Sequence, residues 1–168
     1  MKYLIAGVPG AGKNTVLDEL KKLGYTVCDA DEEITRWENT DGTPAERHTN
    51  PPTDWFQTHF WNWNEAKLKT LLAQHPTIFL GGSASNQDKF YDLFDKIFLL
   101  KIDKNTLRHR LATRTTNDFG KHPNELADIL SWFDWFQDDM AKRGAIIVDG
   151  NLALDKVVSQ ILAEVNET

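Results

Sequence analysis

The sequence predicts an α/β protein in which a five-stranded parallel sheet lies between two layers of helices. Short apolar runs alternate with longer stretches of helical periodicity along the chain, which is typical of a parallel sheet covered on both faces. A glycine-rich turn joins the first apolar run to the first helical pattern. The chain has 168 residues, of which 40% are hydrophobic, so it is long enough to bury a core. We therefore expect one domain over residues 1–168.

The expected strands are short apolar runs, each followed directly by glycine or aspartate. They cover residues 3–6, 25–28, 77–80, 96–102 and 145–148. Helical patterns occupy residues 15–23, 31–38, 55–72, 87–94, 104–113, 124–143 and 154–165. Ligands of such sheets bind beyond the carboxyl ends of the strands. The segments that follow the strands are therefore where we expect the functional residues.

Charge and composition limit the partners of the protein. The net charge of −6 disfavours general binding to nucleic acid, because an acidic surface repels a phosphate backbone. No window contains the ~20 consecutive apolar residues that a membrane span requires. Cys28 is the only cysteine, which excludes an internal disulfide and fits a reducing cytoplasm. We expect a cytoplasmic protein with a small-molecule partner, and the oligomeric state stays open.

The segment GVPGAGK, residues 7–13, has the spacing of a phosphate-binding loop. Glycines in such a loop let backbone N–H groups turn toward phosphate oxygens, and the following helix presents more free N–H groups. The alternative is a glycine-rich turn without a ligand, but the position between a strand and a helix favours the phosphate site. We expect a three-layer P-loop NTPase fold with ATP bound by Pro9, Gly10, Ala11, Gly12, Lys13, Asn14 and Thr15.

The pattern G-x-P-G-x-G-K-x-T of residues 7–15 resembles the adenylate kinase and shikimate kinase group of P-loop small-molecule kinases. This resemblance implies an ATP-dependent phosphotransferase that uses Mg²⁺. Asn14 stands where the standard pattern has Ser or Thr, whereas adenylate-kinase-like members often have Gly followed by Thr. Because Mg²⁺ gives up its waters reluctantly, Asn14 or Thr15 can reach it through water, and Thr15 is a candidate metal residue.

The segment CDADEE after the second strand contains two aspartates, Asp29 and Asp31, that point the same way if the segment is extended. It resembles the Asp-x-Asp of shikimate-type kinases. The resemblance implies that these carboxylates are catalytic, that Asp29 helps to hold magnesium through water, and that Asp31 contacts the acceptor. The alternative interpretation is capping of the following helix, which is compatible with the first.

Arg110 and Arg114 are four residues apart and therefore share one face of the expected helix. Their segment resembles the start of the mobile lid of adenylate-kinase-like enzymes, here residues 114–124. The resemblance implies that Arg110 lies against the adenine of ATP and that Arg114 reaches the phosphates. The alternative is a basic helix in solvent.

Two glycine-containing turns follow later strands. Gly81 and Gly82 resemble the glycine run of shikimate-type kinases, so these two residues, with Ser83 and Asn86, are expected to contact the substrate. The alternative is a turn that caps the next helix. After the last strand, residues 149–151 resemble the adenine loop of these kinases, which implies ATP contacts for Asp149, Gly150 and Asn151.

An aromatic cluster lies between the second and third strands, where the resemblance implies an acceptor-binding insert over residues 34–74. On the helix expected there, Phe56, Phe60 and Trp63 share a face and are candidates for stacking on a nucleobase. The alternative is that they belong to the core.

These observations predict a phosphotransferase that moves the γ-phosphate of ATP–Mg²⁺ to a small acceptor. The aromatic insert favours a nucleoside or nucleoside monophosphate. Two alternatives stay open: a kinase of a shikimate- or gluconate-like metabolite, and a switch that binds or hydrolyses ATP without an acceptor. The guanine-reading pattern N-K-x-D is absent, which disfavours a GTPase.

Overall fold

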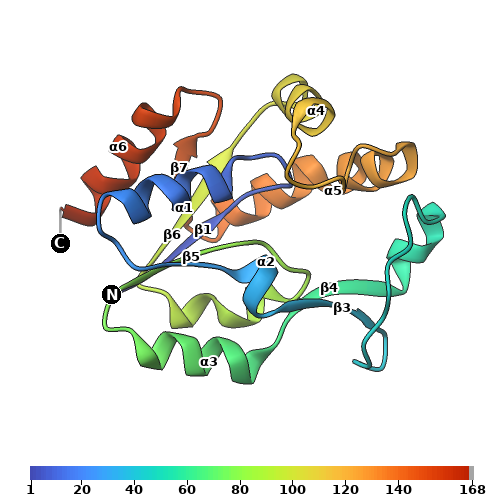
Figure 1. The fold of residues 1–168 in the computed structure, drawn as a ribbon, viewed down its shortest axis with the longest axis horizontal. Coiled ribbons are helices and arrows are strands. Elements are labelled where there is room, and N and C mark those ends of the chain that lie inside the picture. The colour runs from blue at the N-terminus through green and yellow to red at the C-terminus, as the bar shows by residue number, and fades with distance from the viewer. Residues whose placement is uncertain (167–168) are drawn as a thin grey trace.

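A parallel sheet of five strands forms the centre of the protein in a computed structural model that describes residues 1–166 (Figure 1). The strand order is β2-β5-β1-β6-β7. The strands are β1 (Lys2–Ala6), β2 (Val27–Asp29), β5 (Ile78–Gly81), β6 (Lys96–Lys101) and β7 (Ile146–Asp149). All four neighbouring pairs are parallel. The predicted fold class is therefore confirmed.

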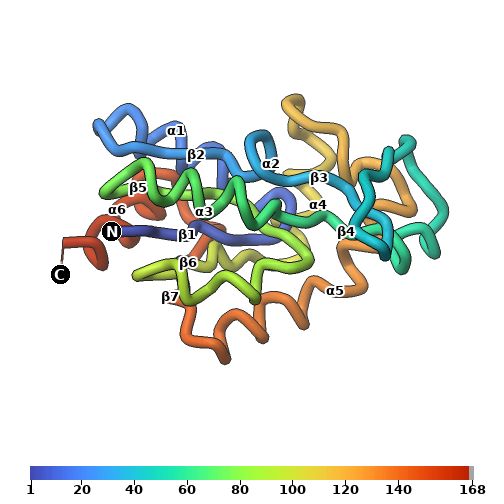
Figure 2. The backbone as a smooth tube through the Cα atoms, turned by 90° about the horizontal axis from the view of Figure 1, so that it is seen from below, coloured from blue at the N-terminus to red at the C-terminus, as the bar shows by residue number. Residues whose placement is uncertain are grey.

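Helices cover both faces of the sheet. The helices α1 (Lys13–Lys22) and α6 (Leu154–Asn166) pack on one face, and α3 (Glu65–Gln74) and α5 (Pro123–Lys142) cover the other (Figures 1 and 2). A short 3-10 helix, η2 (Gln87–Leu93), precedes β6. The middle of each central strand is buried, with side chains such as Leu4, Phe79 and Leu99 at 0% exposure. No helix among residues 1–166 is long and apolar enough to cross a bilayer.

The carboxyl ends of the parallel strands meet at one edge of the sheet. Here the loop after β1 enters α1, and the helix α4 (Lys104–Thr113) packs its Leu107 and Leu111 side chains close to Gly10 of that loop. The chain that follows β2 also extends beyond this edge. The edge therefore collects the segments that the sequence pattern marked as functional.

The predicted helices over residues 31–38 and 55–72 are wrong for most of their length. The structure has a four-residue helix α2 (Ala30–Glu33), a strand β3 (Thr35–Asn39), a 3-10 helix η1 (Thr53–Gln57) and a strand β4 (His59–Trp63), and only then α3. The strands β3 and β4 pair antiparallel outside the main sheet. Aromatic residues favour strands, and pairing across the two segments outweighs the helical spacing of the aromatic run.

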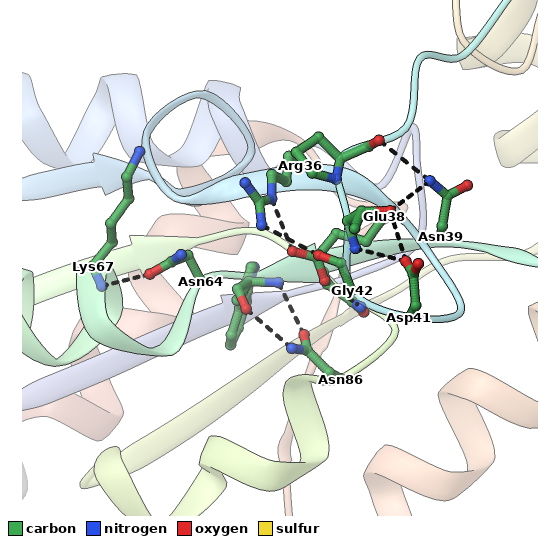
Figure 3. Close-up of polar contacts among 12 residues, drawn as sticks. Arg36, Glu38, Asn39, Asp41, Gly42, Asn64, Lys67 and Asn86 are labelled. Carbon is green, nitrogen blue, oxygen red and sulfur yellow. Dashed lines mark hydrogen bonds and ion pairs between the residues drawn. The ribbon is translucent and has the colours of Figure 1, made fainter.

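Polar contacts fix this antiparallel pair, which we call the β3–β4 arm (Figure 3). Glu38 accepts hydrogen bonds from Arg36 at 2.8 Å and from Asn62 at 3.0 Å. Asn86, which precedes η2, binds both backbone groups of Trp63 through its side-chain amide, at 2.9 and 3.0 Å. The arm is thus attached to the main sheet through the chain that follows β5.

Gly81 and Gly82 allow helices to approach the sheet closely. A Cβ atom at Gly81 would lie 2.5 Å from Cδ1 of Leu17, and one at Gly82 would lie 2.7 Å from Cβ of Ala30. We expect Gly81→Ala to lower the free energy of unfolding by about 1–3 kcal/mol, because the added methyl group overpacks α1 against β5. Chemical denaturation measures this change.

A double-mutant cycle tests the cause of that loss. Leu17→Ala removes both side-chain atoms that lie closest to the added methyl group. The double variant should therefore lose less stability than the sum of the two single variants. Strict additivity would show that the glycine acts in another way.

Candidate active site

A cavity of about 980 Å³ opens at the carboxyl edge of the sheet. The phosphate-binding loop, α4, the β3–β4 arm, the loop before α5, and α5 itself form its walls. A cavity of this size is within the range of small-molecule sites. The predicted site residues that line it are Pro9, Gly10, Ala11, Gly12, Lys13, Asn14, Thr15, Asp31, Phe56, Phe60, Ser83, Arg110, Arg114 and Gly150.

The first turn of α1 leaves its backbone N–H groups without a side-chain cap. Gly12 is the N-cap residue and provides no side-chain hydrogen bond, whereas Asn64 caps α3 and Asp103 caps α4. Gly10 and Gly12 have φ angles of 84° and 98°, in the left-handed region that favours glycine. This loop therefore presents free N–H groups to the cavity, which is the arrangement that binds phosphate.

The side chain of Lys13 is buried inside the phosphate-binding loop. Its Nζ donates hydrogen bonds to the carbonyl oxygens of Gly7 at 2.8 Å and Val8 at 3.3 Å, and only 8% of the residue is exposed. Burial lowers the pKa of Lys13, and the nearby Asp31 carboxylate opposes that shift. The ammonium group is thus held in the loop by backbone carbonyl oxygens.

Arg110 joins three segments of the cavity wall. Its Nη1 donates to the carbonyl of Ala11 at 3.1 Å, and its Nη2 donates to the carbonyl of Gly150 at 2.7 Å. The guanidinium therefore lies between the phosphate-binding loop and the turn after β7.

The turn after β7 contributes less to the cavity than predicted. Gly150 lines it, but Asp149 and Asn151 do not. Asn151 donates twice to Asp149 Oδ1, and its own Oδ1 accepts from the backbone of Asp103 at 3.1 Å. These two side chains shape the turn. The apolar lining here comes instead from Leu152, Leu154 and Val157, which the sequence analysis did not select.

Arg114 directly follows α4 and begins the loop that precedes α5. Its Nη2 donates to the carbonyl of Phe119 in that loop, and its Nε is buried without a hydrogen-bond partner. Burial lowers the pKa of Arg114, and Asp118, Glu125 and Asp31 oppose the shift. Arg114 therefore lines the cavity and has one buried donor, Nε, that no group within residues 1–166 satisfies.

The two aspartates after β2 have different surroundings. Asp29 caps α2, and its Oδ1 accepts from the backbone N–H of Asp31 at 2.9 Å, outside the cavity lining. Asp31 lines the cavity, and its Oδ1 accepts from Nε1 of Trp61 at 3.2 Å. Burial and the charge of Asp31 raise the pKa of Asp29. The structure therefore directs Asp31, and not Asp29, toward the site.

Several predicted substrate contacts lie elsewhere. Trp63 is only 2% exposed and packs near Phe90 and Phe94 in the core. The cavity lining also lacks the two glycines that allow close helix packing and the asparagine that holds the β3–β4 arm: Gly81, Gly82 and Asn86. Ser83 does line it, and its hydroxyl donates to the carbonyl of Gly7 at 2.8 Å.

The cavity residues that sequence reasoning missed include a group near Asp31 and the loop before α5: Trp37, Arg47, Trp61 and Phe119. The ring of Trp37 lies 5.4 Å from that of Trp61 and 6.3 Å from that of Phe119, between centroids. The Asp41-Gly42 turn beside the alternating residues 35–39 could have indicated a strand in place of a helix. No local pattern marks Arg47 or Phe119.

The residues of this site fit a magnesium ion that is bound together with a nucleotide. No cluster of three or more His, Cys, Asp or Glu side chains capable of holding a metal occurs within residues 1–166. Mg²⁺ in nucleotide sites is usually held by one or two protein oxygens, by waters and by the phosphates themselves. Thr15 and Asp31 both line the cavity and offer such oxygens, whereas Asp29 is engaged in its cap.

A family model described as an AAA domain matches residues 4–131 of the chain. The chain belongs to this AAA-domain family. The match covers the phosphate-binding loop, α4 and the first part of α5. No curated protein has a significantly similar sequence.

Solved structures share the fold of this AAA-domain protein. A deoxyadenosine kinase from M. mycoides with bound dATP has a TM-score of 0.61 at 18% identity, over 99% of each chain. The same enzyme with bound dCTP has a TM-score of 0.55 at 19% identity, over 100% of each chain. A gluconokinase from Sinorhizobium meliloti 1021 has a TM-score of 0.58 at 16% identity, over 99% of this chain and 91% of the other. The chain therefore has the fold of P-loop small-molecule kinases.

Proposed function

We propose that the protein transfers the γ-phosphoryl group of ATP–Mg²⁺ to a small acceptor, a nucleoside or a nucleoside monophosphate. One observation carries this proposal: a single cavity has an uncapped phosphate-binding helix end with Lys13 at one side and the carboxylate of Asp31, among aromatic rings, at the other. The resemblance to nucleoside and sugar-acid kinases supports phosphoryl transfer.

The proposed roles follow from the position of each group. The loop of residues 9–15 binds the phosphates of ATP, with Lys13 beside the γ-phosphate. Arg110 contacts the nucleotide between its adenine and its phosphates, because it already bridges Ala11 and Gly150. Arg114, which lines the same cavity, donates from its guanidinium to the transferred group. Magnesium, when bound near Thr15 and Asp31, would neutralise charge on the β- and γ-phosphates.

Transfer needs an acceptor oxygen in line with the γ-phosphorus. That oxygen bonds to phosphorus as the bond to the β,γ-bridging oxygen breaks, and ADP leaves with the bridging oxygen. Asp31 orients the acceptor and takes its proton, which then passes to water. We propose that residues 114–124 form the lid over this reaction and that residues 34–74 form the acceptor-binding insert. Exclusion of water by the lid would limit hydrolysis of ATP.

Two conservative substitutions test these roles. Asp31→Asn should lower kcat for transfer by about 10²–10⁴-fold, because the amide cannot accept the proton. Asp29→Asn should keep most of the activity, since an asparagine side chain caps a helix as well as aspartate does. Labelled ATP–Mg²⁺ with a panel of nucleosides, monophosphates and sugar acids measures both variants. Equal activity of the two variants would contradict the role of Asp31 as proton acceptor. A rate of ATP hydrolysis that no acceptor changes would contradict the proposed kinase activity.

A further inference from the structure

The acceptor end of the cavity is an aromatic surface around one carboxylate. We use this name for the part lined by Asp31, Trp37, Phe56, Trp61 and Phe119. The rings of Trp37, Phe56 and Phe119 lie 6.0 to 6.4 Å apart between centroids. Such a surface suits a flat ring, which gains contact area and favourable ring geometry there.

Asp31 gives this end a negative charge and a free hydrogen-bond acceptor. Its Oδ1 accepts from Trp61, and no group within residues 1–166 donates to its Oδ2. A ring compound with a hydroxyl group could donate to that oxygen. The 5′-phosphate of an acceptor would instead bring a second negative charge to this end of the cavity.

Five cations line the whole cavity within the described chain: Lys13, Arg47, Arg110, Arg114 and Arg143. Lys13 and Arg110 are bonded to the phosphate-binding loop, and the Nε of Arg143 contacts Asp139 at 2.7 Å. Arg114 donates to the carbonyl of Phe119, and the proposed function assigns its guanidinium to the transferred group. Arg47 is therefore the remaining cation for a phosphate on the acceptor.

Arg47 is already committed to a buried partner. Its Nη1 donates to Glu125, whose side chain is 0% exposed. Glu125 also accepts from the backbone N–H groups of Gly120 at 2.9 Å and Asn50 at 3.2 Å. If Arg47 turned to a phosphate, it would leave a buried carboxylate without its countercharge, which is strongly unfavourable. The ring of Phe119 lies 5.1 Å from this guanidinium and holds it further.

We infer that the acceptor is an uncharged ring-bearing hydroxyl compound, a nucleoside, and that nucleoside 5′-monophosphates are rejected. The inference rests on the proposed phosphotransferase function and narrows its acceptor. The Arg47–Glu125 pair acts as the specificity determinant, because it cancels the one positive charge that an acceptor phosphate would need. Among the five residues that define the acceptor end, Asp31 is the one with a charged side chain.

The test compares matched acceptors on the full-length protein. Each ribonucleoside and deoxynucleoside is assayed against its own 5′-monophosphate with labelled ATP–Mg²⁺. We expect kcat/KM for the best nucleoside to exceed that for its monophosphate by at least about a hundredfold. Equal or preferred use of the monophosphate would overturn the inference. Transfer to gluconate alone would also overturn it while leaving the phosphotransferase intact, and binding of ATP without transfer to any compound would overturn both.

A variant of the pair gives a second readout. Glu125→Gln removes the carboxylate charge and should release Arg47 toward the cavity. The preference for nucleoside over monophosphate should then fall at least about tenfold, while the thermal midpoint reports whether the variant is folded. Lys69→Ala, which removes an exposed cation paired with Glu65, is the control and should leave the preference unchanged. An unchanged preference in folded Glu125→Gln would refute the role of the pair.

Discussion

Replacement of Lys13 by alanine should lower kcat/KM for phosphoryl transfer by about 10²–10³-fold, the effect of removing one preorganised electrostatic group. The ammonium group of Lys13 is buried and is held by the carbonyl oxygens of Gly7 and Val8. It therefore stands in place before the nucleotide arrives and needs little reorganisation to meet the phosphates. Steady-state kinetics with the best acceptor from the panel measures the loss.

The control for this prediction lies on the same helix. Lys22 is at the far end of α1, with 71% of its side chain exposed, and pairs with Glu19. Lys22→Ala changes the net charge by the same amount and should leave kcat/KM near the wild-type value. Near-normal transfer by Lys13→Ala would show that the phosphate-binding loop is not the site of ATP.

The phosphate-binding loop and the sheet could be predicted because their information is local. The spacing of Gly7, Gly12 and Lys13 depends on adjacent residues, and the short apolar runs mark buried strands without reference to other segments. The ends of the five predicted strands lie within two residues of those observed. Local patterns of this kind survive folding because tertiary contacts reinforce them.

The acceptor side could not be predicted in the same way. The pairing of Trp37 with Trp61 decides that residues 59–63 form a strand, and this pairing joins segments more than twenty residues apart. The local spacing of the aromatic run fits a helix equally well. The sequence therefore predicts a substrate contact for Trp63, whereas this residue belongs to the core. Only the position of α2 distinguishes the roles of Asp29 and Asp31. The carboxylate of Asp29 caps the first turn of this helix, and that of Asp31 stays in the cavity.

No local sequence pattern predicts the pair of Arg47 and Glu125, because 78 residues separate its members. We expect Glu125→Ala to lower the free energy of unfolding by about 3–5 kcal/mol, because the loss of a wholly buried carboxylate leaves its cationic partner uncompensated. The N–H groups of Gly120 and Asn50 lose their acceptor as well. For a chain of this size the thermal midpoint should fall by roughly 6–20 °C.

Thermal unfolding followed by circular dichroism measures this fall, and two variants locate its cause. Glu65→Ala removes an exposed carboxylate that pairs with Lys69, and it should leave the midpoint unchanged. The N–H groups of Gly120 and Asn50 donate to different oxygens of Glu125, so Glu125→Gln keeps an acceptor for one of them and lacks the charge. Its midpoint should therefore lie between those of Glu125→Ala and the wild type. If Glu125→Ala unfolds at the wild-type temperature, Arg47 does not depend on Glu125. It would then be free to meet a charged acceptor, and the exclusion of monophosphates would lose its physical basis.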